Sequence, residues 1–281
     1  MTVRIVTDST CDLPAETITR YGIYVIPLYI NIDNQGYLDG VDISRAEFYK
    51  RLPLAATHPS TAVPSIERFI ATYNTLADEG ASEVLSIHIS TALSGVIDVA
   101  RVAAREVKST QVTVFDSRQL SLGTGFLVEM AAKMASASST IVEILKALND
   151  QVLRTHVFAA LDTVEFLKRS GRMNKYVAGL ATLIQIKPIL TMYNGKPGSE
   201  RVFTRDRALK RVVEMLASAG KLECVAMVHT HTSEEILARL RTMAAHLLPP
   251  NPILAVDITP VIGAHIGPGA AGFTVIQAST R

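Results

Sequence analysis

The chain has 281 residues, and its 28 lysines and arginines stand against 26 aspartates and glutamates, so the formal net charge is only +2. This balance, with no basic run interleaved with aromatic residues, argues against nucleic acid as a partner. Although 48% of the residues are hydrophobic, no stretch reaches the roughly 18 to 20 apolar residues of a membrane helix, and two cysteines, Cys11 and Cys224, imply no disulfide framework.

Short apolar runs alternate with helix-period segments through the first half of the chain. We predict buried strands at Arg4–Thr7, Glu83–Ile89 and Val112–Phe115, and helices at about Ser65–Leu76, Val96–Val107 and, opened by Gly123-Thr124-Gly125, about Phe126–Met134. The alternation is typical of a parallel, Rossmann-like sheet covered by helices. The first ten residues enter a strand directly and lack the regions of a signal peptide, so we expect a cytoplasmic protein.

Each of the three predicted strands is followed by a polar cluster. The clusters are Asp8-Ser9-Thr10, Ser90-Thr91 with Ser94-Gly95 close behind, and Asp116-Ser117. In an open α/β sheet, ligands bind beyond the carboxyl ends of the strands. We therefore expect the three clusters to meet at one edge of the sheet.

The pattern changes after the small polar stretch at Ser136–Thr140 and a predicted helix at Ile141–Leu153. The length suffices for two domains, and we place them at residues 1–154 and 155–281. The second half is predicted to contain extended runs from Val157, at Ile184–Tyr193 with a hairpin at Asn194-Gly195 returning through Arg201–Thr204, at Cys224–His229, at Ile253–Ile262 and at Phe273–Gln277, with helices at Arg205–Ser218 and Ser233–Leu247. This half suggests a mixed or antiparallel sheet with helices on one face, and we expect a ligand between the two domains.

The glycines near the end of the chain resemble a phosphate-binding pattern. Gly267, Gly269 and Gly272 fit G-x-G-x-x-G, but that fingerprint requires a preceding strand and a following helix within a βαβ unit. Here the glycines lead into the strand-like run that starts at Phe273. We expect them to form a tight turn that follows an apolar strand, where the thin backbone lets a ligand approach His265.

Ser94 and Thr61 are the first candidates for a binding site. Ser94, followed by Gly95 at a helix start, offers a hydroxyl near unpaired backbone N–H groups and the positive end of the helix dipole, which together suit an anion. It could equally be an N-cap that serves only its own helix. Thr61 lies in a predicted loop between two prolines, where it is either a ligand contact or a solvent-facing turn residue.

His265 and Arg172 are the next candidates. His265 could donate to an anion or act as a base, although a lone histidine is more often an ordinary surface residue. Arg172 follows Gly171 at the end of a predicted helix, where it either complements the helix dipole or binds a phosphate or an acidic group of another protein.

Three other side chains carry weaker hypotheses. His229 and His231 alternate along a strand end as metal ligands would, but no third ligand stands nearby, so we predict no metal. Cys11 follows Asp8-Ser9-Thr10 and could be a nucleophile, whereas a buried, inert thiol is the simpler interpretation.

Taken together, these segments resemble the DegV family, whose members bind fatty acids and present them to a fatty acid kinase. The resemblance covers nearly the whole chain. It is carried by Ile5-Val-Thr-Asp-Ser-Thr, the Thr61 loop with Pro64-Ser65, Leu93-Ser94-Gly95, Val114-Phe-Asp-Ser with Gly123-x-Gly125, Leu161-Asp-Thr-Val-Glu-Phe-Leu, Gly171-Arg172, Ile186-Lys-Pro-Ile-Leu and His265-x-Gly-Pro-Gly.

The resemblance implies a carrier that is not an enzyme and needs no cofactor, with a long-chain fatty acid as its ligand. The carboxylate would be held by Thr61, by Ser94 with the Gly95 N–H, and by His265, while Arg172 would serve the complex with the kinase. Brief contact with membrane surfaces would allow lipid exchange. The chain departs from the family pattern at Ala62, Val63, Val96 and Ser170, where polar or glycine neighbours are replaced.

Two other functions compete with this interpretation. Ser94 as nucleophile, His265 as base and Asp8 or Asp116 as the orienting residue would make an esterase, although Ser94 lacks the G-x-S-x-G elbow. A phosphosugar or nucleotide could instead bind at the edge of the α/β sheet.

Overall fold

A four-stranded parallel sheet forms the first layer of the structure. The computed structural model describes residues 2–172 and 186–279. The strand order is β2-β1-β6-β7, with β1 at Val3–Asp8, β2 at Tyr24–Ile26, β6 at Glu83–His88 and β7 at Gln111–Asp116. All pairs are parallel, which confirms the Rossmann-like prediction for this half of the chain.

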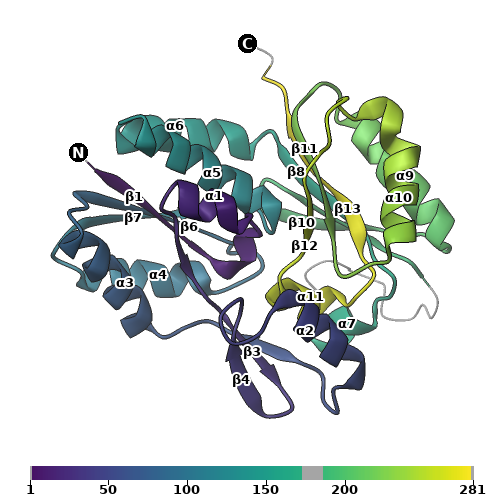
Figure 1. Ribbon diagram of the computed structural model, residues 1–281, viewed down its shortest axis with the longest axis horizontal. Helices are drawn as coiled ribbons and strands as arrows, with labels where there is room; N and C mark the ends of the chain where they lie inside the picture. The colour runs from purple at the N-terminus through teal and green to yellow at the C-terminus, as the bar shows by residue number, and fades with distance from the viewer. Residues whose placement is uncertain (1, 173–185, 280–281) are drawn as a thin grey trace.

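Helices cover both faces of this sheet (Figure 1). They are α1 (Ala15–Arg20), α5 (Leu122–Ser136) and α6 (Ile141–Val152) on one side, and α3 (Ile66–Asp78) and α4 (Val96–Glu106) on the other. The strand period of two explains the division. Ile5 and Leu85 pack with the α5 side, whereas Val6 and Val84 pack with α3 and α4.

A six-stranded mixed sheet forms the second layer. Its order is β10-β9-β8-β13-β11-β12, with β8 at Thr155–Ala160, β9 at Ile189–Tyr193, β10 at Lys196–Glu200, β11 at Leu222–His229, β12 at Ala255–Asp257 and β13 at Ala271–Gln277. Only β11 and β12 pair in parallel; the other neighbours are antiparallel. Helices α9 (Arg205–Ser218) and α10 (Glu234–Ala244) bury one face of the sheet, as the sequence predicted.

A small antiparallel sheet that the sequence did not predict lies beside helix α2. It has the order β4-β3-β5, with β3 at Tyr29–Ile32, β4 at Gln35–Leu38 and β5 at Ser60–Ala62, and α2 covers Arg45–Arg51. The remaining short elements are the 3₁₀ turns η1 (Ser9–Cys11), η2 (Leu52–Leu54) and η3 (Ala245–Leu247) and the helices α7 (Glu165–Arg169) and α11 (Pro260–Ile266).

The two larger sheets share one hydrophobic core. A single cluster of buried side chains includes Ile5 of β1, Leu127 of α5, Ala226 of β11 and Ile262 of α11. Helix α11 also packs against α2, β3, β5 and η1, which all come from the first third of the chain. The domain boundary at residue 154 stays a prediction, because this core contains residues from both sides of it.

The segment around His265 differs from the prediction of a strand followed by a glycine turn. Strand β12 has three residues, and the chain then forms helix α11, with His265 in its last turn. Thr259 caps the helix through its side chain and Pro260 occupies the first turn, a start signal that outweighs the apolar run. Gly267 ends the helix with φ at +76°, so the predicted turn begins one residue after α11.

Smaller differences concern element boundaries. Strand β10 starts at Lys196, directly after the Asn194-Gly195 turn, rather than at Arg201. Helix α5 begins at Leu122, before the glycines that were expected to precede it. Of the predicted run from Ile184, residues 184 and 185 lie outside the described residues.

Candidate functional site

A cavity of about 190 Å³ lies where β5, the start of α4 and α11 meet. Its polar or charged side chains are Thr10, Thr61, Ser94, Arg172 and His265. The rest of the wall is apolar apart from the Gly95 backbone: Leu28, Ala62, Val63, Ile89, Leu93, Leu120, Val261, Ile262 and Ile266. The structure therefore brings together the five residues that the sequence singled out for ligand and kinase contacts, which are Thr61, Ser94, Gly95, Arg172 and His265.

Thr61 and His265 touch across the cavity wall. The Oγ1 atom of Thr61 lies 3.0 Å from Nε2 of His265. Thr61 was expected in a loop, but it is the middle residue of β5, where it pairs with Ile30 of β3. That pairing is not visible in the sequence, because the partner strand lies about 30 residues away and has no local signature.

Ser94 and Gly95 form the wall at the start of α4. The N-cap residue is Gly95, and Ser94 precedes it, with its Oγ accepting from the Val96 N–H at 3.4 Å. The first N–H groups of a helix and its positive dipole end attract anions. Ser94 thus serves its own helix and also lines the cavity.

Arg172 reaches the cavity because the chain reverses after α7. Gly171 adopts φ of +70°, and Arg172 then donates from Nη1 to the Ser170 carbonyl at 3.0 Å. The helix-breaking role predicted for Gly171 is confirmed. The guanidinium group adds a positive charge to the cavity wall, where the other polar groups are hydroxyl groups, an imidazole and backbone groups.

Thr10 is a cavity residue that sequence reasoning missed. Its polar cluster after β1 was noted, but the residue itself was not singled out. Thr10 is buried, and its backbone N–H and hydroxyl both donate to the Asp8 carboxylate. The same carboxylate accepts from the Ile89 N–H at 3.1 Å, so Asp8 ties together two parts of the cavity wall.

Asp8 also belongs to a Ser-His-Asp chain buried beside the cavity. His88 Nδ1 lies 2.9 Å from Asp8, and His88 Nε2 lies 2.7 Å from the Ser86 hydroxyl. Burial raises the pKa of Asp8, but hydrogen bonds from His88 and Thr10 outweigh it and leave that pKa below its ordinary value. All three side chains are fully buried, and the Ser86 hydroxyl is hydrogen-bonded to the Tyr73 hydroxyl. No ester can therefore reach this serine.

The predicted esterase arrangement is not supported by these contacts. Asp8 is engaged by His88, and Asp116 accepts from the Thr91 hydroxyl at 2.7 Å and the Arg118 N–H at 2.8 Å. The aspartates proposed to orient His265 therefore have other partners.

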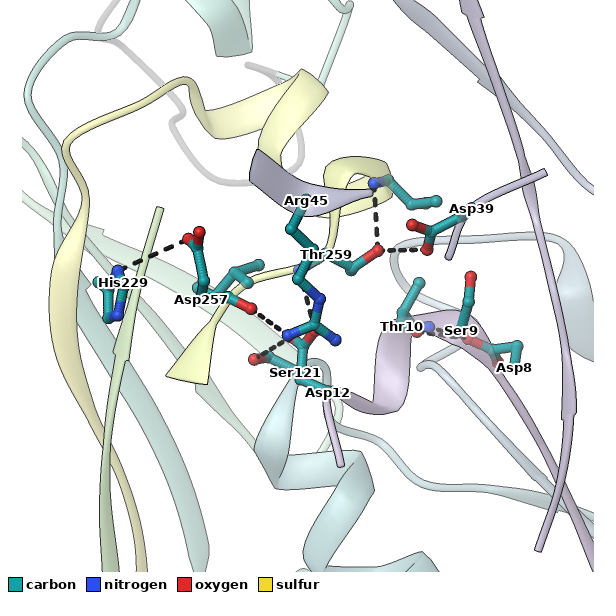
Figure 2. A network of polar contacts seen from close by, with 12 residues as sticks. Asp8, Ser9, Thr10, Asp12, Asp39, Arg45, Ser121, His229, Asp257 and Thr259 are labelled. Atoms are coloured by element: carbon teal, nitrogen blue, oxygen red, sulfur yellow. Dashed lines mark hydrogen bonds and ion pairs between the residues drawn. The ribbon is translucent and has the colours of Figure 1, made fainter. Parts of the chain in front are cut away.

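Behind the cavity, Asp12 anchors the start of α11 (Figure 2). Its carboxylate accepts from the Thr259 N–H at 2.8 Å and the Ser121 hydroxyl at 2.6 Å, and it pairs with Arg45 at 3.0 Å. Complete burial nevertheless raises the pKa of Asp12 to about 7, with Arg45 and the hydrogen bonds opposing the rise. A nearly neutral pKa makes this contact dependent on pH.

The other candidate residues have structural partners. His229 and His231 both approach the Asp257 carboxylate, at 3.5 and 3.2 Å; in residues 2–172 and 186–279, no three potential ligands are arranged for a metal ion. Cys11 is buried, as predicted, and burial raises the pKa of its thiol to about 12, which favours the unreactive, protonated form. None of the helices in those same ranges is long and apolar enough to cross a membrane.

Comparison with known proteins identifies the family of the chain. A family model described as an uncharacterised protein of the DegV family matches residues 2–278. The chain belongs to the DegV family. A DegV domain-containing protein of Listeria innocua is 32% identical over 280 residues, which cover 97% of both chains.

Solved DegV structures share the fold over their whole length. A fatty-acid-binding DegV family protein from Thermus thermophilus matches with a TM-score of 0.86 and 32% identity, over 99% of this chain and 100% of that one. DegV from Bacillus subtilis, a fatty acid binding protein, matches with a TM-score of 0.89 and 28% identity over the same shares. These matches confirm the predicted α/β fold class.

We predict that Asp12 makes the protein less stable as the pH rises toward neutrality. Its pKa of about 7 in the fold exceeds the ordinary value of 3.8, so the folded state holds the proton more tightly. The stabilisation is complete below pH 4 and is lost as the pH rises through 7, with a slope of at most about 1.4 kcal/mol per pH unit. Asp12→Asn, which mimics the protonated acid, should remove this slope in urea unfolding between pH 4 and 8.

The exposed Asp78 supplies the control, because Asp78→Asn should keep the slope of the natural protein. Identical pH profiles for Asp12→Asn and the natural protein would contradict the assignment.

Proposed function

We propose that this DegV family protein binds a long-chain fatty acid, with the carboxylate at Thr61, Ser94, the Gly95 N–H and His265. The proposal depends on one observation, which is that the cavity has a polar part and an aliphatic part. Its hydroxyl, imidazole and guanidinium groups line a space whose other walls are aliphatic. The solved fatty-acid-binding relatives, which share the fold over their full length, support it.

The head of the cavity fits the chemistry of a carboxylate. A carboxylate accepts hydrogen bonds at two oxygens and donates none. Hydroxyl groups, an imidazole N–H and the N–H groups at a helix start can all donate, and hydrogen bonds to a charged group contribute about 1.5 to 3 kcal/mol each. The aliphatic walls fit a phosphosugar or nucleotide poorly.

A second, smaller cavity of about 40 Å³ adjoins the first, and we assign part of the acyl chain to it. The two share Leu120, Ile262 and Ile266. The additional lining comes mostly from the inner face of the six-stranded sheet: Val157, Ala159, Leu190, Met192 and Val228, with Leu161, Thr191, Ser121 and Ile258. Burying about 16 carbons at roughly 0.8 kcal/mol per methylene contributes on the order of 10 kcal/mol before binding costs.

The same proposal includes a role without catalysis, in which the protein presents its ligand to a fatty acid kinase that forms acyl phosphate. Arg172 is the group we assign to that step, because a guanidinium beside a bound carboxylate can stabilise the charge of an arriving phosphoryl group. The two-domain division at residue 154, a cytoplasmic location and brief contact with membranes for lipid exchange belong to this proposal.

We expect Ser94→Ala to weaken palmitate binding about tenfold, since it removes one hydrogen bond to a charged group. Isothermal titration gives the affinity, and the ¹³C carboxyl resonance of bound [1-¹³C]palmitate reports the headgroup position. Ser233→Ala, which removes the N-cap serine of α10, is the control and should change neither. Unchanged affinity and resonance in Ser94→Ala would refute the carboxylate assignment.

Filling the second cavity, of about 40 Å³, should weaken the binding of long fatty acids more than that of short ones. Ala159 is buried on β8 and lines this cavity, so Ala159→Leu should lower palmitate affinity at least tenfold and leave octanoate within about twofold, because each excluded methylene loses about 0.8 kcal/mol. Ala137→Leu, at an exposed site, controls for the added leucine. Equal losses for both acids would mean that the acyl chain lies elsewhere.

The kinase role is tested by acyl phosphate formation in a mixture with a fatty acid kinase, ATP and palmitate. Arg172→Ala should slow product formation at least tenfold at saturating palmitate, because the phosphoryl group loses its cationic partner. Arg169→Ala, three residues earlier and paired with Glu165 on the surface, should have little effect. Absence of acyl phosphate with the natural protein would exclude the role, and equal rates for the two variants would exclude Arg172.

A further inference from the structure

Helix α11 supplies a large part of the cavity wall. His265 and three apolar lining residues, Val261, Ile262 and Ile266, all belong to it. The helix has only seven residues, too few to be stable without tertiary contacts. Whatever fixes its start therefore also fixes the position of His265, six residues and about 9 Å further along the axis.

The three residues that lead into α11 are each held by side chains from the first 50 residues of the chain. Arg45 donates to the Asp257 carbonyl, and the Tyr49 hydroxyl donates to the Ile258 carbonyl at 2.9 Å. Thr259, the next residue, donates from its backbone N–H to Asp12. The position of the backbone that enters the helix is therefore fixed at each of three consecutive residues by side chains from a distant part of the chain.

The Thr259 side chain links this anchor to the helix itself. Its hydroxyl donates to the Asp39 carboxylate and accepts from the Val261 N–H at 3.3 Å, as Figure 2 shows for the Asp39 contact. Thr259, Asp12 and Asp39 are all buried. The N-cap residue Thr259 thus donates its backbone N–H to one carboxylate and its hydroxyl to another. Both carboxylates lie at the end of the helix where the dipole favours negative charge.

Buried charges are an expensive way to attach a helix. Removing a carboxylate from water costs several kcal/mol, and well-packed apolar side chains often give equal or greater stability. Hydrogen bonds have a direction that apolar contacts lack, so they fix the rotation and the axial position of a helix. The half-buried Arg45 pairs with Asp12 in this network.

We propose that Asp12, Asp39 and Thr259 are positioning residues for the headgroup site, which hold α11 so that His265 Nε2 stays within hydrogen-bond distance of Thr61. The inference rests on the proposed function only where ligand affinity is concerned. The His265–Thr61 contact itself belongs to the protein and can be measured without a ligand.

The test compares Thr259→Val with Thr259→Ser. Valine keeps the shape and the backbone N–H but removes the hydroxyl, which leaves the buried Asp39 without that donor; serine restores it. We expect Thr259→Val to weaken palmitate binding about tenfold and to move the ¹³C carboxyl resonance of bound [1-¹³C]palmitate, whereas Thr259→Ser stays within about twofold. In the ligand-free protein, the His265 ring ¹⁵N resonances should move in the valine variant and return in the serine variant.

A matched control is Thr204→Val, which removes the side-chain cap of α9 and should leave both resonances in place. If Thr259→Val does not fold, Asp39→Leu replaces it, since leucine has about the same size but cannot accept the hydrogen bond from Thr259; it should shift the His265 ring resonances as well. Unmoved His265 resonances in a folded variant would overturn the inference. Failure of the natural protein to bind palmitate, with His265 shifted in Thr259→Val, would instead overturn only the proposed function.

Discussion

The close packing of α5 between the two large sheets is the constraint on which the site depends. This helix is buried over most of its length, and it contacts β1 of one sheet and β8 and β13 of the other. Two positions in its first turn require glycine, because a Cβ at Gly125 would lie 2.3 Å from the Cys11 carbonyl oxygen and one at Gly123 would lie 2.8 Å from a Val157 side-chain carbon. The carboxyl ends of the parallel strands are thereby held against the inner face of the mixed sheet, and the cavity lies in that space.

The parts of the fold that the sequence predicted well depend on local signals. Apolar β-rich runs predicted three of the four parallel strands, all but β2, helical spacing after Gly95 predicted α4, and Asn194-Gly195 predicted the hairpin between β9 and β10. Helix α11 was missed because its apolar residues read as a buried strand. Buried helices and strands cannot be distinguished by hydrophobicity alone, and here the Thr259-Pro260 start was the deciding signal.

The candidate site was predicted in part, for a similar reason. Thr61, Ser94 and His265 could be identified from their motifs, and the structure shows that they line one cavity. The roles of Asp12 and Asp39 could not, because their partner Thr259 lies more than 200 residues away. The Ser86-His88-Asp8 chain carries the opposite lesson: three side chains in catalytic order are not an active site when no substrate can reach them.

The position of β13 within its sheet has a consequence for biosynthesis. This strand follows the other five strands of its sheet in the sequence and so leaves the ribosome after them, yet it lies between β8 and β11, and α11, which completes the cavity wall, directly precedes it. The early parallel sheet can form while translation continues, since domains fold as their residues emerge. The mixed sheet cannot close until β13 arrives, so the cavity wall is completed only after α11 and β13 have left the ribosome.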